Sequence, residues 1–572
     1  MKHPVFGSSL AWCGAVAAIV VLAACSAQQT EERESRDAAY IAARPAEQKA
    51  VDAALASAPP AQPLPGRAKH EALGTTAYMA APSHQFMAED RENYGHFESN
   101  PLQLAAEHPV STFSIDVDTG SYANLRRFLR EGRLPPSDAV RVEEMINYFD
   151  YADAGPRDPG IPFSLNTEIA PTPWNVKTHL LRVGIQGWRP QYDRGGPRPP
   201  SNLVFLVDVS GSMDEPDKLP LVQSSLQMLA RELTKADRIT LVVYAGASGV
   251  VLEPTPGDHG AQIEAALDRL HAGGSTNGAS GIQLAYAMAK QSFIKNGNNR
   301  VLLATDGDFN VGTTSFEALL DLVKRERKSG IALTTLGFGT GNYNDHLMEQ
   351  LADAGQGNYA YIDSMNEAHK VLVEQRDATL HTIAADVKIQ IEFNPAVVAE
   401  YRLIGYENRM LKREDFNNDQ VDAGEIGAGH RVTALYEIAL RNSGGERVEP
   451  LRYGDAGKVA AGSGELAFLR LRYKKPEEGA DAASHLLEQV LHRGDVKTDM
   501  ARSSDSFRLA AAVAAFGQIL RGGTYTGTFG YPDAQALVRG ARGTDEHGYA
   551  GELVQLMALA ATLANKQAKS ED

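Results

Sequence analysis

The chain has 572 residues, enough for three or four domains, and its 43% hydrophobic and 22% charged residues are ordinary for globular protein. Its formal net charge of −16, with no basic patch interleaved with aromatic residues, argues against nucleic acid as the main partner.

The first 25 residues are typical of a secretion signal. Lys2 is followed by an apolar segment, Trp12 to Leu22, which is too short to span a membrane as a mature helix. The segment ends in Leu22-Ala23-Ala24-Cys25, which resembles the lipobox of bacterial lipoproteins. An ordinary signal peptide cut near an A-x-A site is the alternative. The resemblance implies that Cys25 is lipidated, and Ser26 after it favours the outer membrane, facing the periplasm or the cell surface.

The cysteine count agrees with this interpretation. Cys13 lies within the signal and Cys25 would carry the lipid, so the mature chain has no free thiol. Disulfides, thiol catalysis and cysteine-ligated metals are therefore excluded.

Residues 26–108 are predicted to form a disordered tether. Ala, Glu, Gln, Arg and Pro dominate up to Gly74, and prolines 59, 60, 63 and 65 break any helix. A flexible coil of about 80 residues spans roughly 50 Å root-mean-square, enough to hold a globular part away from a lipid anchor.

Residues 109–195 carry strands and helices but are too short to form a sandwich of their own. We predict strands at Ser111–Asp116, Phe163–Ile169 and His179–Gln186, and helices at Tyr122–Glu131 and Val140–Tyr148.

Residues 196–380 alternate strand and helix, which predicts a doubly wound α/β domain with a mostly parallel sheet. The expected strands are Leu203–Val207, Arg238–Tyr244, Val250–Leu252, Arg300–Thr305 and Ile331–Phe338. The expected helices are Lys218–Leu233, Gln262–Leu270, Ala279–Phe293, Phe316–Lys328, Asn344–Ala354 and Met365–Leu380.

Residues 381–478 change to a period of two, which predicts an antiparallel β-sandwich. Apolar residues alternate with polar ones in three stretches, 387–393, 432–438 and 467–473. We expect the strands of 163–186 to pair with this region, so that the α/β domain is inserted in the sandwich. Residues 479–572 are predicted to be helical, at Ser506–Leu520 and Tyr549–Leu563.

Oxygen-bearing side chains follow several predicted strands of the α/β domain. Asp208, Ser210 and Ser212 come directly after the apolar strand Leu203–Val207. Thr276 lies in a glycine-rich loop before a helix, and Asp306 ends the strand Arg300–Thr305. The carboxyl ends of parallel strands meet at one edge, so these residues can converge there. Their hard oxygen donors suit Mg²⁺ or Mn²⁺.

The order D-x-S-x-S, then Thr, then Asp-Gly resembles the metal-ion-dependent adhesion site (MIDAS) of von Willebrand factor type A (vWA) domains, over about residues 200–375. The resemblance implies that Asp208, Ser210, Ser212 and Thr276 hold Mg²⁺ directly or through water, and that Asp306 acts through water. It also implies that an acidic side chain of a protein partner completes the coordination. The alternative is that these residues cap helices without any metal.

The segments Phe113–Tyr122, Val421–His430 and Ala514–Gly517 resemble regions that accompany this domain in a family of bacterial lipoproteins. That family has an N-terminal vWA-associated region and a C-terminal domain of unknown function. Asp118-Thr119-Gly120-Ser121 looks like half of an aspartic protease site, but the chain holds no second D-[ST]-G. A strand end followed by a helix cap is the preferred interpretation.

Together these features predict a lipid-anchored envelope protein that binds a protein partner through Mg²⁺ and is not an enzyme. The chain shows no H-E-x-x-H, G-x-S-x-G or G-x-x-x-x-G-K-[ST] pattern. Two alternatives stay open: an envelope hydrolase that uses the vWA domain as a binding module, and a structural scaffold with an empty metal site.

Overall fold

The computed structural model describes residues 91–158, 160–189, 198–307, 316–449, 464–479 and 482–571. The predicted signal, the lipidation site Cys25 and residues 26–90 of the predicted tether lie outside the described residues. The described residues belong to one compact unit, Met87–Asp572. Within them, no helix is both long enough and apolar enough to cross a membrane.

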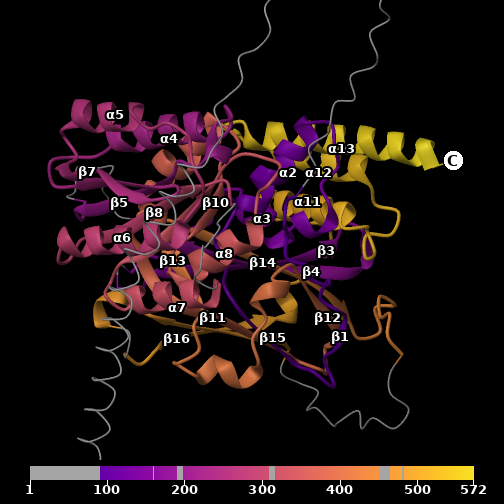
Figure 1. Ribbon diagram of the computed structural model, residues 1–572. Coiled ribbons are helices and arrows are strands. Elements are labelled where there is room, and N and C mark those ends of the chain that lie inside the picture. Colours follow the sequence, from indigo (N-terminus) through magenta and orange to yellow (C-terminus); the bar gives the residue numbers. More distant parts are fainter. Residues whose placement is uncertain are drawn as a thin grey trace, which may run out of the picture. The chain divides into compact units, whose positions relative to one another are not determined.

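A six-stranded sheet forms the centre of the predicted α/β domain, in the order β10-β9-β8-β5-β6-β7 (Figure 1). All neighbouring strands are parallel except β7, which runs antiparallel to β6. The strands are β5 (Ser201–Asp208), β6 (Arg238–Tyr244), β7 (Ser248–Pro256), β8 (Asn298–Thr305), β9 (Ala332–Gly337) and β10 (Tyr359–Tyr361). Every residue of β5 is buried, as expected for a continuous apolar run with helices on both faces.

Helices cover both faces of this sheet. Leu203, Phe205 and Val207 of β5 pack against α4, α5 and the α9 region, whereas Val204 and Leu206 pack against α6, α7 and α8. The helices are α4 (Leu219–Arg231), α5 (Gly260–Asp268), α6 (Gly278–Gln291), α7 (Phe316–Arg327), α8 (Asp345–Ala354), α9 (Met365–His369) and α10 (Arg376–Leu380). The predicted doubly wound α/β fold is therefore confirmed, although Met365–Leu380 is not one helix, because a π-turn, η4 (Lys370–Glu374), interrupts it.

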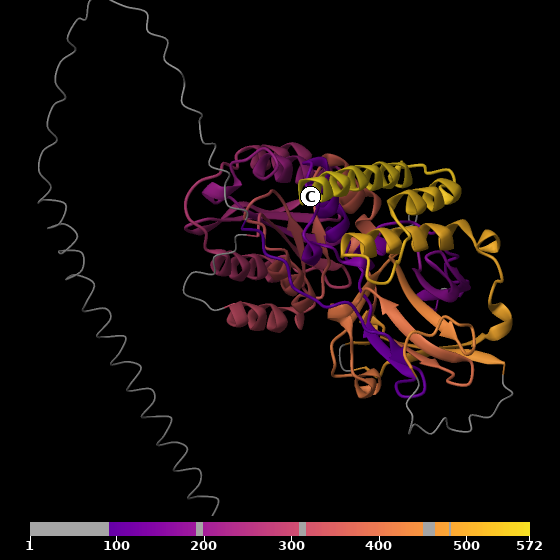
Figure 2. The same ribbon diagram turned by 90° about the vertical axis from the view of Figure 1, so that its right-hand side faces the viewer.

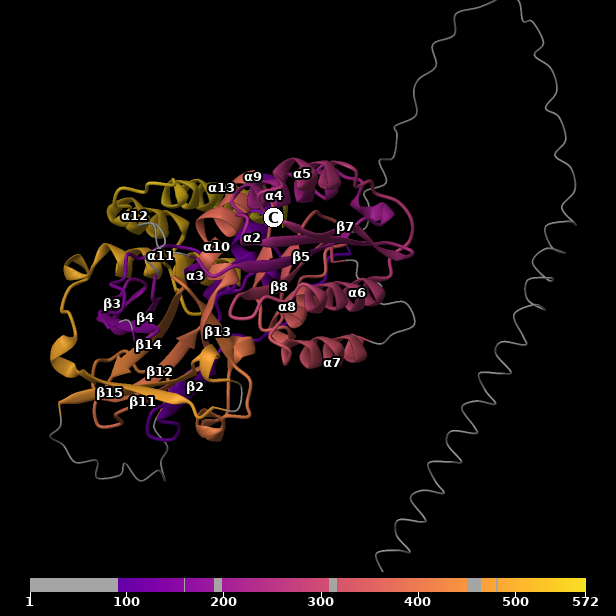
Figure 3. The same ribbon diagram turned by 90° about the vertical axis from the view of Figure 1, so that its left-hand side faces the viewer.

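Two further sheets pack face to face as a β-sandwich (Figure 3). The first has the order β1-β12-β14-β4-β3, and the second β13-β11-β15-β16, with β2 also paired to β11. Their strands are β1 (Gln103–Leu104), β2 (Val110–Ser114), β3 (Phe163–Thr172), β4 (Asn175–Gly187), β11 (Thr382–Phe393), β12 (Val398–Ile404), β13 (Gly424–Gly427), β14 (Arg431–Leu440), β15 (Glu465–Lys474) and β16 (His485–His492).

Strands from before and after the α/β domain share both sheets of the sandwich. In the first sheet Ile185 of β4 lies opposite Val432 of β14, and in the second Phe113 of β2 lies opposite Ile389 of β11. This confirms the predicted insertion of the α/β domain into an antiparallel sandwich. Because the inward side chains of all four strands enter one core, neither flank can bury its apolar face without the other.

Three C-terminal helices lie beside the N-terminal helices (Figure 2): α11 packs on α3, α13 packs on α2, and α12 packs on α11 and α13. They are α11 (Asp505–Leu520), α12 (Tyr531–Ala541) and α13 (Tyr549–Glu571), and their N-terminal partners are α2 (Gly120–Arg130) and α3 (Val142–Asn147). Ser504 caps α11 by accepting a hydrogen bond from the Phe507 N–H at 3.0 Å. Gly517 allows close contact, because a Cβ there would lie 3.1 Å from Val142 and Met145.

Two predicted boundaries lie elsewhere in the structure. Order begins before the predicted tether end at 108, because β1 pairs with β12 and the Asn100 side chain donates to the Gly405 carbonyl at 2.7 Å. The sandwich continues past 478, because β16 pairs along β15. β1 is held by β12, a partner far away in the sequence, whereas β16 pairs with β15, the strand just before it in the chain. The short connecting helices are η1 (Ser137–Ala139), η5 (Glu407–Arg409), η6 (Arg413–Asn417), η7 (Pro476–Glu478), η8 (Arg493–Asp495) and η9 (Met500–Arg502).

His430, between β13 and β14, predicts an acid-sensitive stability. Its Nδ1 accepts the Gly427 N–H at 3.1 Å, and burial, followed by the charge of Arg300, lowers the pKa of His430 to about 3. An unfolded histidine binds its proton near pH 6.5, so between pH 6.5 and 3 protons favour the unfolded chain. We expect His430 to cost up to about 2 kcal/mol of stability as pH falls from 6.5 to 5.

The variant His430→Asn keeps an acceptor at this position but does not titrate. Its urea midpoint should therefore fall less than that of the wild type between pH 7 and pH 5. Parallel losses in the two proteins would show that His430 does not carry the effect.

Candidate metal centre

The candidate site lies at the carboxyl ends of β5 and β8, where the strand order of the central sheet reverses. Val207 of β5 pairs with Ala304 of β8, so Asp208 and Thr305 end these strands side by side, and Asp306 follows directly. The helices that come next, α4 and α7, cover opposite faces of the sheet. Open α/β sheets form their ligand-binding crevice at this point.

Asp208 is fully buried and its two oxygens are held in place. Oδ1 accepts the Ser210 N–H at 2.9 Å, and Oδ2 accepts the Thr305 hydroxyl at 2.9 Å. Burial, together with the negative charge of the neighbouring Asp306, raises the pKa of Asp208 to about 6, against the hydrogen bonds from Ser210 and Thr305. Two buried carboxylates this close are stabilised by a cation between or beside them.

The hydroxyl groups lie toward the open side of the site. Ser210 is 1% exposed, and its Oγ lies 3.1 Å from the Oγ of Ser212, which is half-buried. Thr276 is also half-buried. Two backbone hydrogen bonds tie its loop to the Asp208 loop: Gly211 N–H to the Gly274 carbonyl at 3.0 Å, and Gly273 N–H to the Val209 carbonyl at 2.8 Å.

Asp306 has neighbours that the sequence pattern did not identify. Lys218 Nζ and Asn342 Nδ2 each lie 3.0 Å from Asp306 Oδ2, and Lys218 Nζ also donates to Asn342 Oδ1 at 2.9 Å. Gly307 is required beside this aspartate, because its φ is +80° and a Cβ would lie 2.5 Å from the Asn344 nitrogen. Lys218 and Asn342 come from outside the D-x-S-x-S pattern, and no spacing rule predicts them.

The residues fit a small divalent cation. The five predicted ligands all offer side-chain oxygens. Asp208 and Asp306 are buried, while Ser212 and Thr276 are half-buried and leave one side of the site accessible. Such a set suits Mg²⁺, which keeps part of its coordination for water or for an external ligand. Convergence of Asp208, Ser210, Ser212, Thr276 and Asp306 on one ion stays a prediction.

Thr305 provides a test of this arrangement. The nearly isosteric change Thr305→Val removes the hydroxyl that orients Asp208 Oδ2, and we expect Mg²⁺ affinity to fall by roughly 10- to 100-fold. Isothermal titration with Mg²⁺ measures the change. Thr240→Val, on β6, is the matched control, because the buried Thr240 hydroxyl has no hydrogen-bond partner among the described residues. Equal affinity in the two variants would argue against the assigned role of Asp208.

Comparisons with known proteins match the chain in consecutive blocks. Residues 202–375 match the von Willebrand factor type A domain family, residues 88–182 match a family described as von Willebrand factor, and residues 378–563 match the C-terminal domain family of uncharacterized protein YfbK.

The chain is also similar to individual proteins. The chain is 48% identical over 476 residues to uncharacterized protein YfbK of Escherichia coli (strain K12), covering 82% of this chain and 80% of YfbK. It is 30% identical over 191 residues to uncharacterized protein sll0103 of Synechocystis, covering 33% of this chain and 43% of that protein. A solved von Willebrand factor type A structure from Catenulispora acidiphila aligns at 16% identity with a TM-score of 0.38, covering 69% of this chain and 89% of that one.

Proposed function

Because this chain belongs to the YfbK family of vWA-domain proteins, we propose that it is a lipid-anchored protein of the bacterial cell envelope that binds a protein partner through Mg²⁺. Asp208, Ser210, Ser212, Thr276 and Asp306 hold the ion, with Mn²⁺ as a possible substitute. An acidic side chain of the partner completes the coordination. The role is adhesion, scaffolding or assembly.

The single observation that carries this proposal is the burial gradient at the carboxyl ends of β5 and β8. Asp208 and Asp306 are fully buried, whereas Ser212 and Thr276 are half-buried. A cation bound there keeps one side toward the surface. If Asp306 acts through water, Asp208 alone neutralises the ion directly, so the ion retains positive charge and attracts a carboxylate.

The anchor rests on the sequence Leu22-Ala23-Ala24-Cys25. Lipidation of Cys25 attaches the chain to the membrane, and residues 26–90 connect that anchor to the folded part. Labelling cells with a radioactive fatty acid tests this, since wild type should carry the label and Cys25→Ser should not. A labelled Cys25→Ser variant would place the attachment at another residue.

We propose binding rather than catalysis for this family member. Incubating the purified full chain with envelope polymers tests the alternative, because a hydrolase releases soluble fragments that chromatography detects. Mg²⁺-dependent release that is lost in Asp208→Ala would replace the binding proposal with an enzymatic one.

The direct experiment is co-purification from membranes. The full chain, affinity-tagged at its C-terminus, should retain a protein partner in Mg²⁺ and release it when EDTA is added. A partner retained equally in EDTA would place the contact on the sandwich or the C-terminal helices, and the metal site would have a structural role.

A further inference from the structure

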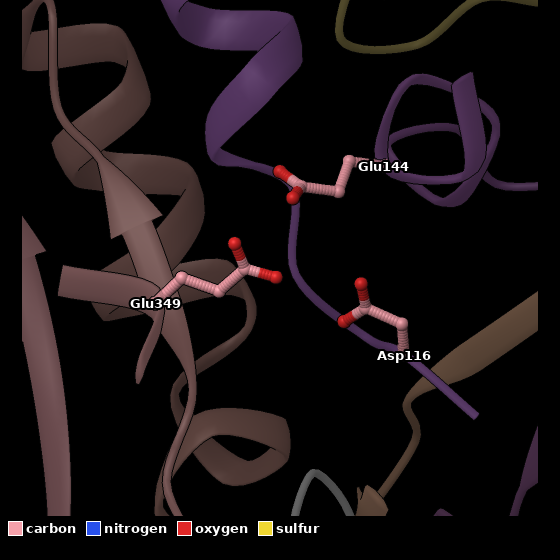
Figure 4. A group of neighbouring side chains, drawn as sticks. All are labelled: Asp116, Glu144 and Glu349. Carbon is pink, nitrogen blue, oxygen red and sulfur yellow. The ribbon is translucent and has the colours of Figure 1, made fainter. Parts of the chain in front are cut away.

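A second group of acidic side chains is buried where the N-terminal region, the vWA domain and the sandwich meet. Asp116 follows β2, Glu144 lies in α3, and Glu349 lies in α8 of the vWA domain. Each offers an oxygen, and these oxygens all lie within 4.8 Å of one another. Figure 4 shows the three carboxylates pointing into a common space.

Negative charge exceeds positive charge around this space. The buried carboxylates are Asp116, Asp118, Glu143, Glu144, Asp345 and Glu349, each at most 4% exposed. The guanidinium groups that pair with them are those of Arg141 and Arg409. Unneutralised buried carboxylates are costly, so the cluster needs either protons or a further cation.

Hydrogen bonding leaves acceptor oxygens available on the three side chains. Asp116 is 4% exposed, and its Oδ2 has no hydrogen-bond partner among the described residues; its nearest cation is Arg409 Nε at 3.5 Å. Glu349 Oε2 lies 3.7 Å from Arg141 Nη1, beyond hydrogen-bond distance. Glu144 Oε2 accepts the Ser121 N–H at 2.8 Å and has a second lone pair.

We propose that Asp116, Glu144 and Glu349 form a second cation site, distinct from the Asp208 site, that takes Ca²⁺. Two oxygens bound to one Ca²⁺ ion can lie at most about 4.8 Å apart, since Ca–O distances are about 2.4 Å. The three carboxylate oxygens lie within 4.8 Å of one another, close enough together to hold one such ion. Ca²⁺ also tolerates irregular carboxylate geometry better than Mg²⁺ does.

The surroundings supply what such a site requires. Arg141 donates to Glu144 and Asp345, and Asn408 donates to Glu349, so the ligands are held in orientation by neighbours. Asn408 and Arg409 also line a surface cavity of about 210 Å³, which provides a route for the ion.

The position of the site assigns it a role in holding the molecule together. Asp116 and Glu144 belong to the N-terminal region, whereas Glu349 belongs to the vWA domain, more than 200 residues later. An ion bound to all three side chains links the inserted vWA domain to the N-terminal region. Its binding therefore stabilises the orientation in which the Asp208 site is presented.

The test uses the full chain carrying Asp208→Ala, which removes the first site, after dialysis against chelator. Isothermal titration with CaCl₂ should show one Ca²⁺ per chain and weaker Mg²⁺ binding. Adding Glu349→Gln should weaken Ca²⁺ binding by more than about 100-fold, because a charged ligand is lost. Adding Glu326→Gln instead, on α7, is the matched control and should leave Ca²⁺ binding unchanged, because Glu326 pairs with the surface residue Lys290.

Thermal unfolding is an independent test, because Glu349→Gln should shift Tm in opposite directions without and with Ca²⁺. Glu349→Gln should raise Tm in EDTA, because it removes an uncompensated charge, and should lower Tm relative to wild type in Ca²⁺. Ca²⁺ should also slow hydrogen exchange in 115–121 and 345–354. Asp116→Asn serves as a second variant if Glu349→Gln does not fold.

The proposal is overturned if the Asp208→Ala chain takes up no Ca²⁺ at millimolar concentration, which would show that protons alone neutralise the cluster. It is also overturned if Ca²⁺ binding survives both Glu349→Gln and Asp116→Asn. Neither result bears on the Asp208 site, because that site is absent from every chain in the test.

Discussion

Asp208→Ala is expected to abolish Mg²⁺ binding and partner binding together. Asp208 is a buried carboxylate of the candidate site, and its loss would remove a negative charge that we propose holds the ion. We expect Mg²⁺ affinity to fall by more than about 100-fold, because losing a direct ligand costs more than losing a group that orients one. Titration calorimetry and pull-downs with and without EDTA measure the two effects.

The dependence of partner binding on monovalent salt distinguishes a contact at the metal from long-range electrostatic effects. The chain carries a net charge of −16, which repels an acidic partner at long range. Monovalent salt screens that repulsion beyond about 8–10 Å but acts less on a carboxylate at the ion. Partner binding should therefore hold steady or strengthen as salt rises, and vanish in EDTA at every salt concentration.

Asp214→Ala is the matched control for Asp208→Ala. Asp214 lies at the end of the same loop, is exposed, and carries the same charge. It should bind Mg²⁺ and the partner as the wild type does. If Asp214→Ala weakens both as strongly as Asp208→Ala, net charge rather than a defined site would explain the binding.

Arg126→Ala is expected to destabilise the protein by about 3–5 kcal/mol, because it leaves buried carboxylates without their cation. Arg126 lies in α2 and is 3% exposed. Its guanidinium bonds Asp363 at 2.7 Å, Glu367 at 2.8 Å and Glu552 at 3.1 Å. These partners come from the end of the vWA domain and from helix α13, so one side chain joins three regions of the chain.

Arg130→Ala is the matched control on the same helix. Arg130 also pairs with Glu552, at 2.5 Å, but its side chain is 51% exposed, so its loss should cost less than about 1 kcal/mol. Urea unfolding followed by intrinsic fluorescence measures both variants. Equal shifts of the midpoint would mean that the pairing with Glu552, which both arginines share, accounts for the stabilisation.

Periodicity in the sequence predicted much of the fold correctly. The uninterrupted apolar run of β5 predicted a buried parallel strand, and the alternation in β11, β14 and β15 predicted the strands of an antiparallel sandwich. These predictions succeed because side-chain direction repeats every two residues in a strand and every 3.6 in a helix, which is a local property. Strand β1 was missed because it is only two residues long and its partner β12 is distant in the sequence. Strand β16 was missed because the region from 479 onward was predicted to be helical, although β16 pairs with the preceding strand β15.

The candidate metal site, too, could be predicted from the sequence only in part. Asp208, Ser210 and Ser212 are neighbours in one loop, so their spacing alone suggested a site, and the two other loops follow from strand order. The contacts of Lys218 and Asn342 with Asp306 could not be predicted, because they depend on the way two loops meet.

The sequence by itself determined the type of most elements and the insertion of an α/β domain into a sandwich, whereas the residues of the Asp208 site stay a prediction. Only the tertiary structure decided which distant charges meet. The Asp116, Glu144 and Glu349 cluster and the Arg126 network each join residues separated by more than 200 positions. Charged side chains carry no periodic signal of burial. Their environment is set by the packing of whole elements, so their pairing becomes visible only once those elements are in place.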